Sequence, residues 1–401
     1  MKQGWTYKKL GEVCDFEGGS QPPKNEWVSS PKDGYIRMLQ IRDFTKSRTV
    51  HAEYVKLSKK LRTCNKDDIL IGRYGASVGK ILTGLAGAYN VALIKAIPDE
   101  KSVFKRFLRR YFESSHFQNI LIKVCSSRAA QAGFSKKDIE DTLVYLPSIS
   151  EQERIVARLD AAFAEIDKLK ANAEKQLNEA RALFKKTLNE ATAPKDEWNK
   201  GTAQDVFDDI TDFVAAGSFA DLKKNVKYKD IPDFAQLVRT TDLKNEFQNK
   251  SFVYVDEHAY NYLWRVNLNE ECIILPNVGV NCGEVYFVNP SILRHENNVL
   301  GPNAILVRSK KVNNHFLAYY MKGVNFQKEI FRITSSMAQP KYNKTNLKKL
   351  ILFYPDTTEQ QAIVDRLDAL SESVKELEEL NRKTVIECDA LKQALLRQIF
   401  E

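Results

Sequence analysis

The chain has 401 residues, of which 43% are hydrophobic and 28% charged, a composition typical of a globular protein with two or three domains. No apolar run approaches the ~18 residues of a transmembrane helix, and residues 1–5 lack the apolar stretch of a signal peptide. The six cysteines include no Cys-x-x-Cys pair, which argues against a disulfide scaffold and a structural zinc site. We therefore expect a cytoplasmic protein with no membrane partner.

Positive charge is concentrated near the start of the chain. The 61 Lys and Arg residues exceed the 52 Asp and Glu residues by nine. Residues 1–150 carry 26 basic and 15 acidic side chains, whereas residues 194–356 carry 21 and 19. A basic domain favours a polyanionic partner, because contacts with phosphates supply much of the affinity for nucleic acids. Charge alone leaves a second interpretation open, in which the surplus lysines only keep the domain soluble.

The chain contains one sequence unit twice. Residues 146–161 recur as residues 354–369, with Pro, Glu-Gln, Ile-Val and Arg-Leu-Asp-Ala at the same spacing in both copies. Further matches in the same order are Gly75 and Gly79 with Gly279 and Gly283, Asn90 with Asn303, and Asp43 with Asp242. This pattern indicates a repeat of about 200 residues.

Each repeat begins with a globular body, residues 1–150 and residues 194–356, which hold nearly all of the Gly, Pro and aromatic residues. Short apolar runs bounded by Gly, Asn and Asp predict strands in both bodies. The predicted strands include residues 68–71 and 272–275, and the predicted helical stretches are residues 103–121 and 314–331. We therefore expect a mixed α/β (α+β) fold in each body.

Each repeat ends in a segment predicted to form one long helix, residues 151–193 and residues 357–401. Neither segment contains Gly or Pro. Ser150 lies three residues before Glu153, which is the spacing of a capping box at the start of a helix, and the second segment repeats this spacing.

Apolar residues recur along both helices at alternating steps of four and three, which is the heptad pattern of a coiled coil. The seam residues are Ile155, Leu159, Ile166, Leu169 and Leu183 in the first helix, and Ile363, Leu367, Val374, Leu377 and Leu391 in the second. Because both seams have the same register, we expect the helices to pair as an antiparallel coiled coil with a body at each end and pseudo-twofold symmetry. An alternative is two separate amphipathic helices, each packed on its own body.

The sequence lacks the motifs of common catalytic sites. Its five histidines have no metal-ligand spacing. Residues 75–81 resemble a phosphate-binding loop, but they are one residue too short and lack the Ser or Thr after the lysine. We interpret this segment as a turn, and we expect no metal, no cofactor and no catalytic residue on this chain.

Two divergent bodies, each followed by Pro-x-x-x-Glu-Gln-x-x-Ile-Val-x-x-Leu-Asp and a long helix, resemble the specificity subunits of type I restriction-modification enzymes. The resemblance covers the whole chain. It implies that the two bodies are target-recognition domains, each reading one half of a bipartite DNA site, and that the helices are spacers. The implied partners are double-stranded DNA, two methyltransferase subunits and restriction-translocase subunits. S-adenosylmethionine, ATP and Mg are then expected on those partner subunits.

Recognition of bases requires side chains with directed donors and acceptors, such as Arg for guanine and Asn or Gln for adenine. In the first body the candidates are Arg37, Gln40, Arg42, Arg73, Tyr74, Ser77, Ser127, Arg128 and Gln131. In the second body they are Arg239, Thr241, Asn277, Asn281, Ser336, Gln339 and Lys341. Residues 18–21 with Lys24 are a further candidate, loosely matched by residues 215–218.

Two other classes of function stay open. One is the specificity module of a related restriction system, in which one fused polypeptide carries both methylation and cleavage. The other is a coiled-coil scaffold with no role in DNA binding, against which the basic first body and its arginine-bearing loops argue.

Overall fold

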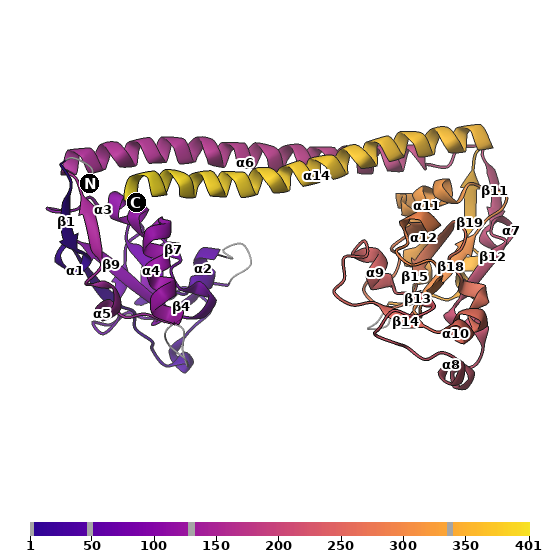
Figure 1. The fold of residues 1–401 in the computed structure, drawn as a ribbon, viewed down its shortest axis with the longest axis horizontal. Coiled ribbons are helices and arrows are strands. Elements are labelled where there is room, and N and C mark those ends of the chain that lie inside the picture. Colours follow the sequence, from indigo (N-terminus) through magenta and orange to yellow (C-terminus); the bar gives the residue numbers. More distant parts are fainter. Residues whose placement is uncertain (1–3, 46–50, 127–132, 335–339) are drawn as a thin grey trace. The chain divides into compact units, whose positions relative to one another are not determined.

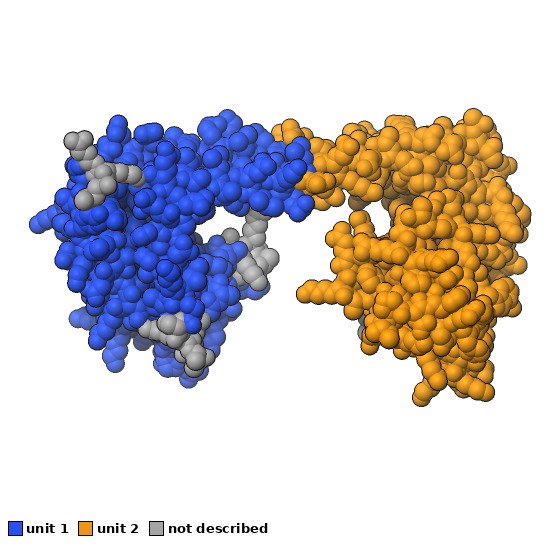
Figure 2. Space-filling model, viewed as in Figure 1, with its two compact units in different colours: residues 1–174, 380–401 blue, residues 175–379 orange. Residues whose placement is uncertain are grey.

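The computed structural model describes residues 4–45, 51–126, 133–334 and 340–401. The chain divides into two compact units, residues 1–174 with 380–401 (unit 1) and residues 175–379 (unit 2) (Figure 2). Each unit contains one globular body and one half of each long helix. Among the residues described, none of the helices combines the length and the apolar character needed to cross a membrane.

The body of unit 1 is built on three sheets (Figure 1). The first is antiparallel, in the order β2 (Cys14–Gly18), β9 (Leu93–Pro98), β6 (Ile69–Gly72) and β7 (Ile81–Leu82). The second has the order β4 (Glu53–Lys56), β3 (Tyr35–Leu39), β8 (Gly87–Tyr89) and β5 (Thr63–Cys64), with β3 and β8 parallel. The third pairs β1 (Thr6–Lys9) with β10 (Leu143–Leu146). The helices of this body are α1 (Leu10–Val13), α2 (Ile41–Thr45), α3 (Lys105–Glu113), α4 (Ser115–Ser126) and α5 (Lys136–Ile139).

The body of unit 2 repeats this plan. Its antiparallel sheet has the order β12 (Asp209–Asp212), β18 (Ala304–Arg308), β15 (Cys272–Pro276) and β16 (Tyr286–Val288). Its second sheet has the order β14 (Val253–Val255), β13 (Ala235–Val238) and β17 (Asn298–Leu300), and β11 (Asn199–Thr202) pairs with β19 (Ile351–Tyr354). The helices are α7 (Ala203–Val206), α8 (Phe219–Asn225), α9 (Thr240–Lys244), α10 (Glu257–Tyr262), α11 (Asn314–Lys322), α12 (Val324–Ile333) and α13 (Lys344–Lys348).

The predicted mixed α/β fold and internal repeat are confirmed, with two corrections. Each helical stretch expected in a body is two helices, because the chain bends at Ser114 between α3 and α4 and at Gly323 between α11 and α12. The alignment of Asn90 with Asn303 is wrong by two residues. In the sheets, Gly72 faces Leu93 and Pro276 faces Ala304, so that Leu93 and Ala304 are equivalent.

One glutamine in each body stabilises the bend between these helices. Gln118 Nε2 donates to the carbonyl oxygens of Gly79 at 2.9 Å and Phe112 at 2.7 Å. In unit 2, Gln327 Nε2 makes the same two bonds, to Gly283 at 2.9 Å and Met321 at 2.7 Å. The repeated glycines thus lie in a turn that is tied to the helical layer in the same way in both units.

The long helices are α6 (Ile149–Ala191) and α14 (Thr357–Phe400), and they pack against each other within each unit (Figure 1). In unit 1, Lys392 pairs with Asp167 and Lys170 pairs with Asp389, both at or below 2.7 Å. The residue numbers rise along α6 as they fall along α14, so the two helices are antiparallel there. In unit 2, Arg181 pairs with Glu378 at 2.7 Å, and Leu188 of α6 packs in one apolar cluster with Ile363 and Leu367 of α14.

The predicted seam is correct at the start of α6 and wrong further along. Ile155, Leu159 and Ile166 are buried, but Leu169 is 57% and Leu183 53% exposed. From Phe163 on, one position in each heptad moves forward by one residue, while Ile166 of the predicted seam stays buried. An α-helix has 3.6 residues per turn, so a strict 3.5-residue pattern drifts around it by about 20° per heptad.

Bulky side chains fill the face to which the seam moves. Phe163, Leu177 and Leu188 are buried and Phe184 packs against the core of unit 2. On α14, Ile363 and Leu367 are buried, Val374 and Leu377 are half-buried, and Leu391 is 50% exposed. The bulk of Phe163, Leu177 and Phe184 therefore decided the contact face more than the heptad spacing did.

The Glu-Gln motif joins each body to its long helix through one buried glutamine. The side chain of Gln152 accepts a hydrogen bond from the backbone N–H of Phe104 at 2.8 Å and donates to the carbonyl of Pro147 at 2.9 Å. Gln360 accepts from the N–H of Asn313 at 2.9 Å and donates to the carbonyl of Pro355 at 2.8 Å. Each glutamine thus links the first turn of a long helix to the N-cap residue immediately before α3 or α11.

We predict that Gln360→Ala destabilises the protein by about 1–3 kcal/mol, because it leaves the buried groups of Asn313 and Pro355 without their partner. Chemical denaturation followed by circular dichroism measures the change. The matched control is Gln361→Ala at the exposed neighbouring position, which we expect to change the free energy of unfolding by less than about 0.5 kcal/mol. Equal losses in both variants would contradict the role of the buried amide.

Candidate nucleic-acid interface

The first cluster of candidate residues in unit 1 lies where β3 ends and α2 begins. The buried carboxylate of Asp43 accepts hydrogen bonds from the backbone N–H of Gln40 and from Arg37 Nη2, both at 2.8 Å. A bond between a guanidinium and a buried carboxylate is charge-assisted and directional. Asp43 therefore fixes both the local backbone and the direction of the half-buried Arg37 side chain.

A second carboxylate, that of Glu53 on β4, accepts hydrogen bonds from the other polar side chains of this cluster. Glu53 Oε2 accepts from Gln40 Nε2 at 2.9 Å, and Glu53 Oε1 accepts from Lys24 Nζ at 2.6 Å. Arg42 also pairs with Glu53. Burial would raise the pKa of the Glu53 carboxyl, but these donors outweigh burial, so its pKa lies below the ordinary value.

Unit 2 has an equivalent cluster at the junction of β13 and α9. The fully buried carboxylate of Asp242 accepts from the backbone N–H of Arg239 at 2.8 Å, from Arg239 Nη2 at 2.7 Å and from Asn249 Nδ2. This ion pair raises the pKa of the Arg239 guanidinium. Thr241 lies exposed on α9. The buried aspartate is thus common to both units, whereas Arg239 stands where unit 1 has Gln40.

The glycine turns carry the second cluster of each unit. In unit 1 the turn begins with Arg73, whose Nε donates to the carbonyl of Phe134 at 3.2 Å and whose guanidinium lies 5.0 Å from the ring centre of Tyr74. Ser77 follows in the same turn and is half-buried. Gly79 has φ +78°, and a Cβ there would lie 2.3 Å from Gln118 Oε1, so this turn requires glycine.

In unit 2 the corresponding residues carry amides. Asn277 Nδ2 donates to the carbonyl of Tyr342 at 3.0 Å, and Asn281 Oδ1 accepts from Lys244 Nζ at 2.7 Å. The exposed Lys341 lies next to this turn through its bridge with Val278. The candidates Ser127, Arg128, Gln131, Ser336 and Gln339 lie outside the described residues.

One short segment brings the two clusters of each unit together. In unit 1, the N–H of Asn90 donates to the carbonyl of Leu39, which precedes Gln40, and the N–H of Arg73 donates to the carbonyl of Ala92. In unit 2, the N–H of Gly301 donates to the carbonyl of Val238, and the N–H of Asn277 donates to the carbonyl of Asn303. The clusters therefore meet where the two sheets of a body join.

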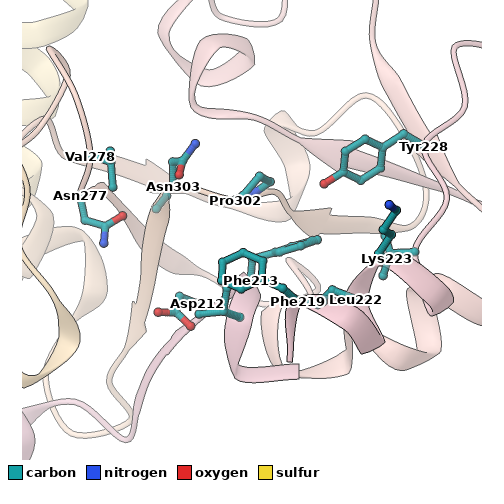
Figure 3. A pocket seen from close by; sticks show the side chains of 13 residues that line it. Asp212, Phe213, Phe219, Leu222, Lys223, Tyr228, Asn277, Val278, Pro302 and Asn303 are labelled. Carbon is teal, nitrogen blue, oxygen red and sulfur yellow. The ribbon is translucent and has the colours of Figure 1, made fainter. Parts of the chain in front are cut away.

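An open pocket with a volume of about 470 Å³ lies beside this junction in unit 2 (Figure 3). Figure 3 shows Asn277 and Val278 at one end and Tyr228 and Lys223 at the other, with Phe213 between them. Phe219 also lines the pocket, although it is 84% exposed. Aromatic and apolar walls next to amides suit contact with the face of a base or the methyl group of thymine.

Sequence reasoning missed Glu53 and Asn249, which connect the predicted residues. No spacing rule relates Glu53 to Gln40 or Asn249 to Arg239. The strand pattern around residues 53–56 was the available signal, because a strand paired with β3 places Glu53 beside the end of β3. Among the described residues, no group of three or more His, Cys, Asp or Glu side chains is arranged to hold a metal ion.

Two copies of one α/β body, each with a polar cluster at a sheet junction and each tied to a long helix, define a duplicated recognition protein. The chain belongs to the family of the type I restriction modification DNA specificity domain, whose model matches residues 2–179 and 195–388. It is thus a protein of DNA sequence specificity with two recognition domains, here called recognition domain 1 (the body of unit 1) and recognition domain 2 (the body of unit 2).

Individual relatives agree over nearly the full length. The type I restriction enzyme MjaVIII specificity subunit of Methanocaldococcus jannaschii is 22% identical, and the alignment covers 99% of this chain and 92% of that protein. The EcoBI specificity subunit of Escherichia coli is 21% identical, with coverages of 100% and 86%. The HsdS subunit from Thermoanaerobacter tengcongensis has the same fold at a TM-score of 0.55 and 17% identity, with coverages of 100% and 97%. A chain from a type I R-M system, solved to explain complex assembly and conformational transition, matches at a TM-score of 0.75 and 16% identity, with coverages of 99% and 98%.

We predict that Arg73→Ala lowers the affinity for the chain's own target DNA by about 1–3 kcal/mol more than it lowers the affinity for unrelated DNA. No carboxylate of the described residues pairs with Arg73, so its guanidinium can be used for a base edge. Fluorescence anisotropy with both DNAs measures the difference. Lys66→Ala, at an exposed basic position of the same domain, is the control and should weaken both affinities alike. A uniform loss in Arg73→Ala would assign this residue to phosphate contact.

Proposed function

We propose that this chain is the DNA-recognition subunit of a type I restriction-modification complex, in which each recognition domain reads one half of a bipartite target. One observation carries the proposal: the two domains keep the same buried scaffold but place different polar side chains on it. Gln40, Arg42 and Arg73 in recognition domain 1 correspond to Arg239, Thr241 and Asn277 in recognition domain 2. Two sites built alike with different donors and acceptors suit two different half-sites.

In the proposed complex, two methyltransferase subunits dock on this chain and restriction-translocase subunits join for cleavage. S-adenosylmethionine, ATP and Mg belong to those partners, and this chain supplies no catalytic group. The paired helices α6 and α14 hold the recognition domains at a set separation. The alternative partner, a fused methyltransferase-nuclease, is distinguished by which proteins co-purify with the chain.

The proposal predicts that the recognition domains are exchangeable. Replacing residues 1–148, which end immediately before α6, with the equivalent part of another family member should change one half of the target and leave the other half intact. Sequencing of methylated positions in DNA from cells that carry the chimera and its methyltransferase partner measures the target. A simultaneous change in both halves would refute independent reading.

A second prediction concerns the distance between half-sites. One heptad inserted after Ala173 in α6, and one after Val385, which lies opposite according to the ion pairs of unit 1, keeps the apolar face in register. Each helix becomes about 10 Å longer, which equals about three base pairs of DNA. The unread spacer of the target should therefore lengthen by two to three base pairs while the half-sites stay the same. Methylated-site mapping is the measurement, and an unchanged spacer with normal activity would show that the helices do not set the distance.

A further inference from the structure

We propose that Glu53 is a specificity-determining residue of recognition domain 1, and that it acts by fixing the orientation of the Gln40 side-chain amide so that Gln40 reads an adenine. This inference rests on the proposed function and assigns the chemistry of one of its two reading sites. Glu53 itself is a positioning residue, because it acts on DNA through Gln40.

The first step in the argument is the position of the Glu53 carboxylate. It lies at the start of β4, and its side chain is 22% exposed. Both of its oxygens are engaged by donors from two other segments, namely Lys24 on one side and Gln40 and Arg42 on the other. This carboxylate is therefore held in place, and it in turn holds Gln40.

The second step is the orientation of the amide. With Nε2 of Gln40 at 2.9 Å from Glu53 Oε2, rotating the amide by 180° would place the Gln40 oxygen against a carboxylate oxygen. Two acceptors cannot share a hydrogen bond, so only one orientation is favourable. Among the described residues, Glu53 is the one that hydrogen-bonds this amide, which leaves Oε1 and the second N–H of Gln40 for a ligand.

The third step is the match to a base. Adenine presents N6–H₂ as a donor and N7 as an acceptor in the major groove, and an amide oriented in this way satisfies both at once. A freely rotating glutamine makes this pair in one of its two orientations only. Fixing the orientation therefore favours adenine over the other bases before DNA binds.

The fourth step is the comparison with recognition domain 2, where the arrangement is absent from the described residues. Strand pairing places Glu53 opposite Met38 and Val253 opposite Leu237, so the equivalent of Glu53 is the apolar Val253. The equivalent of Gln40 is Arg239. Its guanidinium has only donors and no acceptor, so it has no second orientation that exchanges a donor for an acceptor. The carboxylate thus accompanies the glutamine and not the shared scaffold.

The test uses the full chain reconstituted with its methyltransferase partner and compares the methylation motifs of the wild type, Glu53→Gln and Gln40→Ala. A wild-type chain that yields no bipartite motif refutes the proposed function itself. Given a motif, the half read by recognition domain 1 is the half that changes when residues 1–148 are exchanged. We expect both Glu53→Gln and Gln40→Ala to lower discrimination at one and the same adenine of that half by about fivefold or more.

A double variant separates orientation from direct contact. If Glu53 acts through Gln40, adding Glu53→Gln to Gln40→Ala produces no further loss at that position. Glu26→Gln removes a charge from an exposed position of the same domain, outside this cluster, and should leave the motif unchanged. Thermal unfolding confirms that each variant is folded.

Three results would overturn the inference. They are an unchanged motif in folded Glu53→Gln, a relaxed position in the other half-site, and a further loss in the double variant. The last result would show that Glu53 contacts DNA directly. If Glu53→Gln fails to fold, Gln40→Ala still tests the inference. A folded Gln40→Ala chain that keeps the wild-type preference for adenine at each adenine of the half-site read by recognition domain 1 would refute it.

Discussion

The buried amides of Gln152 and Gln360 are the contacts on which the attachment of each body to its long helix depends. Each amide makes two hydrogen bonds to the backbone. Its N–H donates to the carbonyl of a proline before the long helix, and its oxygen accepts from the N–H at the start of a body helix. A helix attached only by its connecting loop would pivot on the body. The buried bonds remove that freedom, so the direction of the long helix is fixed relative to the body that it follows.

The repeat separates the groups that build the sheet junction from the groups that line it. Asp43 and Asp242 each bind the backbone at the start of a short helix, and Gln118 and Gln327 each hold a glycine turn, with nearly equal distances in the two units. These side chains point inward and are the same in both units. The side chains at the junction differ, as Gln40 and Arg239 do. The two recognition domains thus share the groups that build the junction and differ in the side chains that the junction presents.

The sequence was sufficient for the repeat, the two helices and the general position of both clusters, because these follow from local patterns. Leu169 was placed wrongly because the contact face of a helix depends on the bulk of Phe163 and Leu177 as well as on spacing. The bend at Ser114 was missed because an apolar pattern continues through it. Glu53 could not be found because its partnership with Gln40 depends on the pairing of β3 with β4, a long-range contact that local patterns do not contain.

The polar clusters also show that several basic side chains at the junctions are paired with carboxylates. In recognition domain 1, Lys24, Arg37 and Arg42 face the carboxylates of Asp43 and Glu53, so much of the positive charge at the junction is neutralised before DNA binds. In recognition domain 2, Arg239 faces Asp242 and Lys244 faces Glu284. Phosphate contacts carry no information about sequence, and under the proposed function they are made by basic side chains outside these ion pairs. Each junction therefore presents donors and acceptors whose directions are set by buried or half-buried carboxylates.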